Sequence, residues 1–542
     1  MTPSGARAPA AAVTPAIDAP LVDAAELRAI LGDGQELALL DVREEGAFAR
    51  GHLLTAASLP LSKLETRIDA LVPRRDARIV LVDDDENLAR RALTRLRGFG
   101  YGRIAVLAGG IGAWKAAGHQ LFSGVFVPSK AFGEVVEHRD GTPAIDATEL
   151  KRLMEAGTDM VVLDSRPEGE FKAMSLPGGW NCPGAELVYR IHELVKRPET
   201  LVVVNCAGRT RSIIGAQSLI NAGLPNKVVA LRNGTMGWHL AGFALEGGKT
   251  RMVPPPGAEA LAKAKAAAAG IARRFGIRCI GRGELERLRA EPARTTYCFD
   301  VRSPEEYAGR HLSGFRSAPG GQLVQATDTY AATRNARLVL ADDDGVRATM
   351  TAHWLIQLGW PEVVTLDPAA MAEASETGPE IQAVLGLKDV PTIAPTELGA
   401  SKDVAILDLA TSIQYRKGHV PGARFAQRPD LAAAIAGMSL AQRIVLTSPD
   451  GVIARLAVPE VQALTDRPVL ALAEGTAGWK AAGRALESGD GPGGVRDDDV
   501  YYRPYDRQAQ IEEAMRDYLR WEIALADQVK REDYVKFPSP PV

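Results

Sequence analysis

The stretch VVVNCAGRTRSIIGAQSL, residues 202–219, combines three local patterns. An apolar run of β-branched residues ends at Cys206, a short loop rich in glycine and arginine follows, and then apolar residues recur at helical spacing. The pattern predicts a buried strand, a tight loop, and a helix that begins near Ser212. The predicted loop consists of Cys206, Ala207, Gly208, Arg209, Thr210 and Arg211.

Such a loop can turn its backbone N–H groups inward and bind an anion at the start of a helix. Gly208 permits the backbone angles that this needs. The two arginines add positive charge, and Thr210 and Ser212 add hydroxyl donors. All of these groups should favour the thiolate form of Cys206, which is a nucleophile. A buried, unreactive cysteine is the alternative, and two arginines within the next five positions argue against it.

The chain repeats a second pattern four times. Each copy begins as a short apolar strand that ends in aspartate, and a polar turn and an aromatic residue follow. The aspartates are Asp41, Asp164, Asp300 and Asp408, and the aromatic residues are Phe48, Phe171, Tyr307 and Tyr415. Three copies then carry a histidine, namely His52, His311 and His419. Three copies end in a helix with tryptophan, at Trp114, Trp238 and Trp479.

The strand, loop and helix around Cys206 also recur, 42 residues after the aspartate in the first three copies. The other three loops read DDDEN, DDDGV and SPDGV, so they have no thiol, and their aspartates should repel an anion. From strand to helix end, Leu201–Gly223 spans 22 positions, whereas Ile79–Gly100 and Leu338–Gly359 span 21. This count predicts silent loops that are one residue shorter. One copy should perform chemistry, while the others serve as scaffold or substrate walls or keep a residual binding role.

Short apolar strands that alternate with helices predict an α/β fold, in which four tandem domains each have a small parallel sheet with helices on both faces. The predicted domains, here called units 1 to 4, span residues 20–125, 140–248, 276–375 and 390–488. Unit 2 is predicted to be catalytic. A disordered lead (1–19), a linker with a helix (249–275) and a C-terminal helical tail (495–542) complete the division.

The tail is predicted to form one helix that docks on its own protein, with a dimer contact as the alternative. Its apolar stripe consists of Ile511, Met515, Tyr518, Leu519, Ile523 and Leu525.

The composition restricts the class of protein. The 542 residues carry a net charge of −3 and only four cysteines, which predicts a reducing, cytoplasmic location and no nucleic-acid or membrane partner. No apolar run is long enough for a transmembrane helix. The eight histidines are scattered and no C-x-x-C pair occurs, so no metal site and no cofactor are expected. The aspartate runs 83–85 and 342–344 could suggest a hard cation, but a solvated turn is the preferred interpretation.

The motifs LDSRPEGEF, VVVNCAGRTRS and LRNGTMGWHLAGFALEGG together resemble a rhodanese domain, the fold of thiosulfate and mercaptopyruvate sulfurtransferases. The resemblance extends over all four units and implies a sulfurtransferase in which Cys206 accepts sulfane sulfur as a persulfide. It implies an anionic donor such as thiosulfate, an acceptor such as cyanide, sulfite or a thiol, and a possible partner enzyme of sulfur metabolism. The loop residues Ala207 to Ser212 would then bind the persulfide and the donor.

The resemblance also implies that Asp164 and Arg166 form a structural pair. Glu170 stands where two-domain members of the family often have a substrate-binding arginine, and the loop matches neither typical donor signature, so the donor stays open. Cys182 could resolve the persulfide or be an ordinary buried cysteine. Cys279 and Cys298 are given no role.

Two other functions compete with this one. A cysteine phosphatase or arsenate reductase would need a C-x5-R loop, whereas Arg211 lies five positions after Cys206 and Ser212 lies six after. A sulfur carrier or docking scaffold would form the persulfide on Cys206 but turn over poorly with small acceptors.

Overall fold

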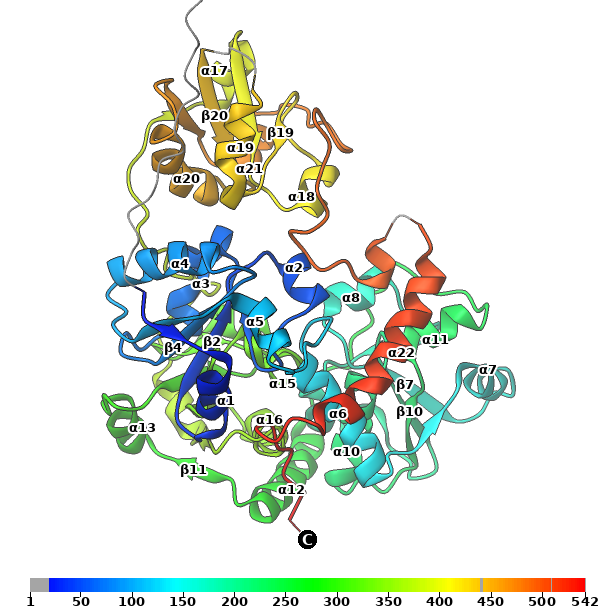
Figure 1. Ribbon diagram of the computed structural model, residues 1–542. Helices are drawn as coiled ribbons and strands as arrows, with labels where there is room; N and C mark the ends of the chain where they lie inside the picture. Colours follow the sequence, from blue (N-terminus) through cyan, green and yellow to red (C-terminus); the bar gives the residue numbers. More distant parts are fainter. Residues whose placement is uncertain (1–18, 439–441, 508, 542) are drawn as a thin grey trace, which may run out of the picture.

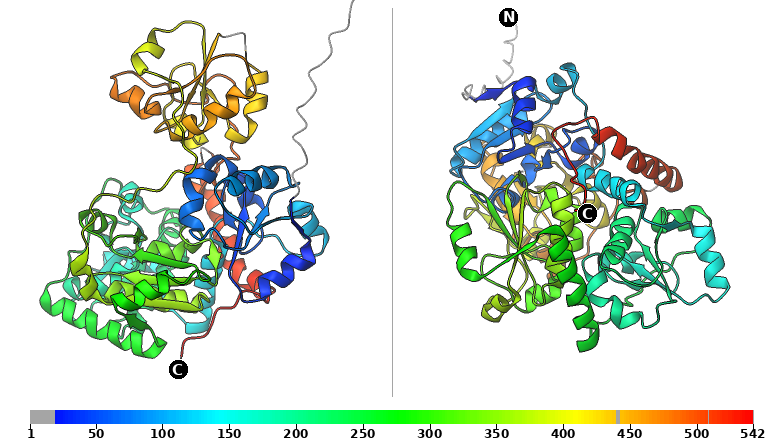
Figure 2. Two further views of the ribbon diagram at one scale, coloured as in Figure 1. Left: turned by 90° about the vertical axis from the view of Figure 1, so that its left-hand side faces the viewer. Right: turned by 90° about the horizontal axis from the view of Figure 1, so that it is seen from below.

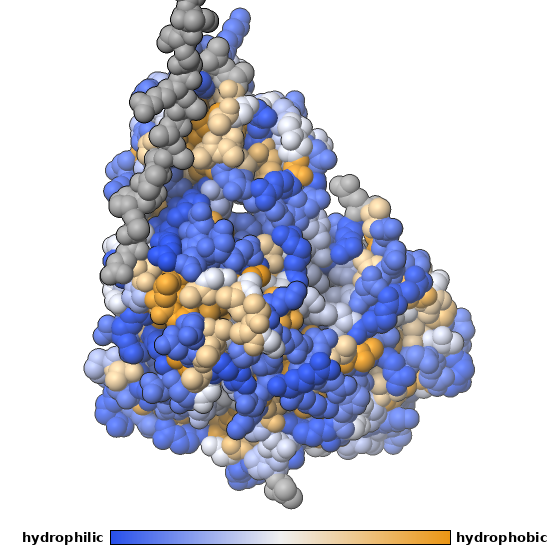
Figure 3. Space-filling view, in the orientation of Figure 1, coloured by the Kyte–Doolittle hydropathy of each residue, from blue (hydrophilic) through white to orange (hydrophobic). Residues whose placement is uncertain are grey.

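The computed structural model describes residues 19–438, 442–507 and 509–541, and in them the chain forms four β-sheets, one for each predicted unit (Figure 1). The predicted lead over residues 1–19 lies outside the described residues except for Ala19, which is buried in the core of sheet 1. No helix in the described ranges is long and apolar enough to cross a membrane. The face seen in Figure 1 is mostly hydrophilic (Figure 3).

The four sheets share one strand order, and their repeated strands run parallel. Sheet 1 is ordered β1 (Leu21–Val22), β5 (Ile104–Leu107), β4 (Ile79–Val82), β2 (Leu37–Asp41), with β3 (Ala57–Ser58) and β14 (Thr333–Arg334) both on β2. Sheet 2 is ordered β6 (Ala144–Ile145), β10 (Val228–Leu231), β9 (Leu201–Asn205), β7 (Met160–Asp164), β8 (Trp180–Asn181). Sheet 3 is ordered β11 (Arg278–Ile280), β16 (Glu362–Leu366), β15 (Arg337–Ala341), β12 (Thr296–Asp300), β13 (Arg316–Ser317). Sheet 4 is ordered β17 (Thr392–Ile393), β21 (Val469–Leu472), β20 (Arg443–Thr447), β18 (Val404–Asp408), β19 (Arg424–Phe425).

Helices lie on the faces of these sheets, as expected for parallel strands with crossover connections. Unit 1 contains α1 (Ala24–Gly32), α2 (Glu45–Arg50), α3 (Leu64–Leu71), α4 (Asn87–Gly98) and α5 (Gly110–Ala116). Unit 2 contains α7 (Ala147–Glu155), α8 (Glu168–Ala173), α9 (Glu186–Leu194), α10 (Thr210–Asn221) and α11 (Gly234–Leu240). Unit 3 contains α13 (Arg282–Arg289), α14 (Pro304–Gly309), α15 (Gly320–Gln325) and α16 (Val346–Gln357), and unit 4 contains α17 (Pro395–Ala400), α18 (Ser412–Lys417), α19 (Leu431–Ala436), α20 (Val452–Gln462) and α21 (Gly475–Ala481). The predicted α/β fold is confirmed.

The strand pairing aligns the four copies residue by residue. Asp164 lies beside Asn205 across the β7–β9 pair, and the other strand-end aspartates lie beside Val82, Ala341 and Thr447. The next residue in each copy opens the loop, so the residues equivalent to Cys206 are Asp83, Asp342 and Ser448.

This alignment corrects the predicted difference in loop length. The loop opener lies 17 residues before the glycine that ends the helix in each of the first three units, at Gly223, Gly100 and Gly359. The earlier count began one residue too early in unit 2, because Val202 rather than Leu201 is the equivalent of Ile79 and Leu338. In all four units the helix begins four residues after the loop opener.

One strand departs from the parallel pattern. β14 belongs to unit 3 in sequence, yet it pairs antiparallel with β2 of unit 1, with Thr333 opposite Ala38 and Arg334 opposite Leu37. Nearby, the Tyr297 hydroxyl donates to the carbonyl of Leu71 at 2.5 Å. Units 1 and 3, far apart in the sequence, therefore pack directly against each other.

Two long helices outside the sheets connect the units. α12 (Ala258–Phe275), the predicted linker helix, packs against α9 of unit 2 and α16 of unit 3 (Figure 2). α22 (Ile511–Val529), the predicted tail helix, packs along α6 (Val127–Asp140). The docking of the tail on its own protein is confirmed, but Ile511 and Ile523 of the predicted stripe are exposed. The buried face instead includes Glu522.

Two buried histidines make the fold sensitive to acid. Burial lowers the pKa of His52 to about 4 and that of His353 to about 3. In the unfolded chain each histidine binds a proton near pH 6.5, whereas in the folded protein it stays neutral to a lower pH. The free energy of unfolding therefore falls as the pH drops from about 6.5 toward 4, by about 1.4 kcal/mol per pH unit for each histidine.

We therefore expect the melting temperature to fall less in the His353→Phe variant than in the parent protein when the pH is lowered from 7.5 to 5.5. Phenylalanine keeps the ring contacts with Phe275 and Trp354. Thermal unfolding at both pH values measures the effect, and equal losses in both proteins would contradict it.

Candidate active site

Cys206 lies at the end of β9, and α10 begins at Thr210, two residues before the predicted start. Its side chain is 2% exposed, and its Sγ lies 3.6 Å from the Ser212 hydroxyl, which itself donates to the carbonyl of Arg209 at 2.7 Å. The loop packs on the start of α11, where Gly234 has a φ of +54°, and a Cβ there would lie 2.3 Å from the Cys206 carbonyl oxygen. Glycine is thus required at this contact.

The equivalent loops of the other units hold an oxygen ligand where unit 2 holds sulfur. Asp342 accepts from the N–H groups of Gly345 at 2.8 Å and of Arg347 and Ala348 at 2.8 and 3.1 Å. Asp83 likewise accepts from Glu86 and Ala89. The expectation that these aspartates only repel an anion is therefore incomplete, because the first aspartate is itself the anion bound by the loop. These turns are also closed by side-chain hydrogen bonds rather than being simply solvated.

Unit 4 shows the same arrangement with a hydroxyl group. The Ser448 Oγ accepts from the N–H of Ala454 at 3.2 Å, six residues on, as Asp83 does from Ala89 and Asp342 from Ala348. Ser212 lies six residues after Cys206. The Cys206 sulfur therefore occupies the position over the helix start at which the sister units hold carboxylate or hydroxyl oxygen.

The guanidinium of Arg209 is bound to carboxylates and is therefore not free for the predicted role of donor binding. Its guanidinium donates to Glu134 through Nε and Nη2, both at 2.7 Å, and also pairs with Glu137. Both glutamates come from α6. With His138, their ligand atoms lie within 4.8 Å of one another, but the guanidinium already binds the two carboxylates. Arg209 therefore joins the loop to α6.

Arg211 forms a second ion pair, with Glu170 of α8. Its two terminal nitrogens lie 2.9 Å from the two Glu170 oxygens, which is a bidentate contact. Arg211 also lowers the pKa of the Cys206 thiol. Its charge therefore still acts on the thiol, although its hydrogen bonds go to Glu170 and Gln322.

The C-terminal helix α22 covers the loop. The Thr210 hydroxyl donates to Glu522 at 2.5 Å, and a Cβ on Gly208 would lie 2.9 Å from the other Glu522 oxygen and 3.1 Å from Tyr518. Ala207 shares an apolar cluster with Met236, Met515 and Leu519. Sequence reasoning did not identify Glu522, although a charged residue inside the apolar stripe of the tail was a signal for it.

Burial determines the ionisation of the thiol in this closed arrangement. Desolvation raises the pKa of Cys206. Arg211 and Ser212 lower it and so offset part of this effect, while Glu522 raises it further. The expectation of a lowered thiol pKa is wrong here, because the cost of burial outweighs the effects of Arg211 and Ser212.

Comparisons with known proteins agree with this geometry. A family model of the rhodanese-like domain matches residues 23–117, 146–241 and 282–369. The crystal structure of a thiosulfate sulfurtransferase from Pseudomonas aeruginosa is 47% identical, with 96% of this chain and 100% of that chain covered and a TM-score of 0.93. The HTH-type transcriptional regulator Rv0324 of Mycobacterium tuberculosis is 27% identical over 220 residues, which are 40% of this chain and 88% of that protein.

The chain belongs to the rhodanese-like family. The three matched ranges fall in units 1, 2 and 3, and sheet 4 repeats their strand order. The expectation of a rhodanese-type sulfurtransferase is confirmed by the match to the Pseudomonas protein.

The other residues singled out in the sequence of this rhodanese-like chain lie mostly in buried positions. Arg166 donates to Asp164 at 2.9 and 2.7 Å and to the carbonyl of Met174, with both side chains buried. Cys182 is fully buried in the shared core of units 2 and 3, and burial raises its pKa. Cys298 is buried too, whereas Cys279 is exposed.

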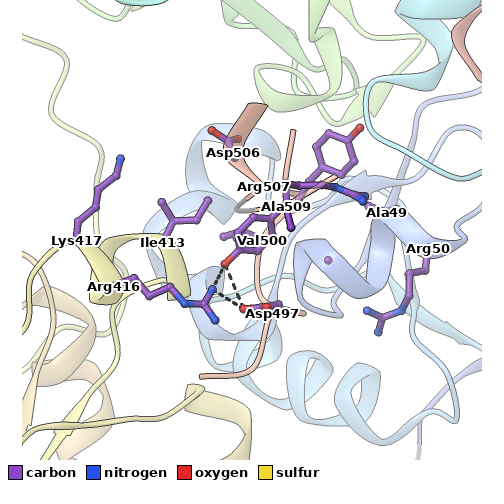
Figure 4. A pocket seen from close by; sticks show the side chains of 13 residues that line it. Ala49, Arg50, Ile413, Arg416, Lys417, Asp497, Val500, Asp506, Arg507 and Ala509 are labelled. Atoms are coloured by element: carbon purple, nitrogen blue, oxygen red, sulfur yellow. Dashed lines mark hydrogen bonds and ion pairs between the residues drawn. The ribbon is translucent and has the colours of Figure 1, made fainter. Parts of the chain in front are cut away.

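An open cavity of about 730 Å³ lies between α2, α18 and the segment around Tyr501 of this rhodanese-like chain (Figure 4). Arg416 crosses it to the Tyr502 hydroxyl at 2.7 Å and to Asp497 at 2.6 Å. The residues that line this cavity do not include Cys206, so it belongs to the junction of units 1 and 4 rather than to the cysteine loop.

Proposed function

We propose that this chain transfers sulfane sulfur from thiosulfate or a related anionic donor to a nucleophilic acceptor, with Cys206 as the carrier. The Pseudomonas relative is a thiosulfate sulfurtransferase of nearly the same length and fold. One observation carries the proposal further, namely that Cys206 alone among the four loop openers is a thiol, while two of its equivalents are carboxylates bound by the loop N–H groups. N–H groups that can bind a carboxylate can also bind the charged sulfur of a thiolate or persulfide.

The first step forms a persulfide on Cys206. The thiolate attacks the outer sulfur of thiosulfate, a new S–S bond forms to Cys206, and the S–S bond of thiosulfate breaks. The electron pair of that bond leaves with sulfite. Arg211, which lowers the pKa of the thiol, stabilises the attacking thiolate and the leaving charge near it.

The second step returns the enzyme to its starting state. Cyanide, sulfite or a thiolate attacks the terminal sulfur of the persulfide, and the electron pair of the S–S bond returns to the Cys206 sulfur. With cyanide the product is thiocyanate. The residues from Ala207 to Ser212 are the proposed binding residues for the sulfur in both forms, and the Ser212 hydroxyl already lies 3.6 Å from Sγ.

Arg211 also argues against the phosphatase alternative. A phosphatase needs a free guanidinium to clamp the phosphoryl group, whereas both terminal nitrogens of Arg211 are bound to Glu170. The burial of the thiol favours the carrier or docking-scaffold function as a companion to catalysis, because a closed thiol limits turnover with small acceptors. The four free cysteines support the proposal of a reducing, cytoplasmic location.

Intact mass after incubation with thiosulfate tests the proposal. We expect the protein to gain about one sulfur atom, to lose it on addition of cyanide, and to release thiocyanate in a steady-state assay. Mercaptopyruvate in a parallel incubation tests the choice of donor. Hydrolysis of an aryl phosphate, without any gain of sulfur, would support the phosphatase instead.

A further inference from the structure

The Glu522 carboxylate is bound by groups that suit a small anion. One of its oxygens accepts from the Thr210 hydroxyl at 2.5 Å and lies 3.4 Å from the Thr210 backbone nitrogen, at the start of α10. The same oxygen lies 3.5 Å from the ammonium of Lys130, a residue of α6. A helix start, a hydroxyl and an ammonium together form a site for a sulfonate or carboxylate group.

The second Glu522 oxygen lies at the loop without a partner. Glu522 is 1% exposed, and this oxygen has no hydrogen-bond partner among the described residues. It faces Gly208, where a Cβ would lie 2.9 Å away. A buried carboxylate oxygen that makes no hydrogen bond costs free energy, which weakens the docking of α22 at this point.

Both arginines of the loop are already paired with carboxylates. Arg209 binds two glutamates and Arg211 binds Glu170, as described above. Lys130, only 5% exposed, has Glu522 as its single carboxylate partner among the described ion pairs. It also donates to the Tyr518 hydroxyl of α22, so Lys130 loses both partners if the helix leaves, and a bound anion would restore the charge contact.

We propose that Lys130 and Thr210 form the subsite for the terminal oxyanion group of the sulfur donor, and that Glu522 occupies this subsite when no donor is bound. The proposal rests on the proposed function and names the binding site of its anionic donor. Docking of α22 and binding of thiosulfate then exclude each other. The helix competes as a tethered carboxylate.

Two substitutions with opposite expected effects test the subsite. Glu522→Gln removes the competing charge but keeps an acceptor for Thr210, so the KM for thiosulfate should fall about tenfold. Lys130→Met removes a donor-binding cation, so KM should rise about tenfold, and Lys130→Arg should restore part of the loss. If α22 were only a lid, Lys130→Met would loosen it and lower KM, as Glu522→Gln does, which would overturn the proposal.

A matched control and a direct readout complete the experiment. Asp527→Asn alters an exposed ion pair on the same helix and should leave KM unchanged. In the Cys206→Ser protein, which forms no persulfide, thiosulfate should increase hydrogen exchange of residues 511–529. Unchanged exchange, or KM values within twofold of the parent in both variants, would overturn the subsite.

The outcome is separable from the failure of the proposed function. If the parent protein gains no sulfur from thiosulfate, the sulfurtransferase proposal itself fails. If it gains sulfur and only the KM and exchange effects are missing, Cys206 chemistry stands and the subsite alone is wrong.

Discussion

Replacement of Cys206 by serine is expected to abolish the gain of sulfur from thiosulfate and to lower sulfur transfer to cyanide by about 10³-fold or more. The hydroxyl of serine is far less acidic than a thiol and forms no stable bond of this kind to sulfane sulfur. The substitution is nearly isosteric, so the ion pairs that fix the loop, from Arg209 to α6 and from Arg211 to α8, should remain. Intact mass and thiocyanate release measure the two effects.

The other cysteines supply the controls for this prediction. Cys182 is closed inside the core of units 2 and 3, so Cys182→Ser should still gain one sulfur atom, at some cost in stability. Cys279 is exposed and could react on its own, so Cys279→Ser should also leave the gain intact. A Cys206→Ser protein that still gains sulfur would assign the chemistry to another residue.

Replacement of Arg211 by methionine should lower the kcat/KM for thiosulfate at pH 7 by about 10- to 100-fold. The cationic guanidinium of Arg211 lowers the pKa of the Cys206 thiol. Its loss raises the pKa of the thiol, so less thiolate is present at pH 7. The acid limb of the pH profile of kcat/KM should therefore move to higher pH.

Two other residues near the thiol also affect its pKa. Ser212 on the loop lowers its pKa, while Glu522 on α22 raises it, and neither changes in the variant. Arg211→Lys keeps the charge but not the bidentate contact with Glu170, so it should restore most of the acid limb. A methionine variant whose pH profile superimposes on that of the parent would refute the role assigned to Arg211. Thermal unfolding checks that the unpaired Glu170 has not merely unfolded the site.

The repeated strands and the cysteine loop could be predicted because their signals are local. The aspartate at the end of each second strand, the apolar run before Cys206 and the glycine after each helix lie within a few residues of what they control. The one error of alignment, the loop length, arose because strand starts are poorly marked in sequence, and only the pairing of Asp164 with Asn205 fixed them.

The surroundings of the cysteine could not be predicted in the same way. Glu522 lies 312 residues from Thr210 in sequence, and Glu134 lies 75 residues from Arg209. Sequence reasoning therefore treated both loop arginines as free for the donor. The tail helix was correctly expected to dock, but its pattern did not indicate that it docks on the thiol, and burial by that helix reversed the expected pKa shift.

The pairing of β14 with β2 has a consequence for the handling of this protein. Without β14, the backbone N–H and C=O groups of Leu37 and Ala38 would lie open along the rim of sheet 1. Bare rims of this kind recruit strands from other molecules and seed aggregation. A fragment that stops before residue 333 should therefore self-associate, even though it contains Cys206 and the whole of unit 2, and isolation of the reactive half would need a mutation that blocks this rim.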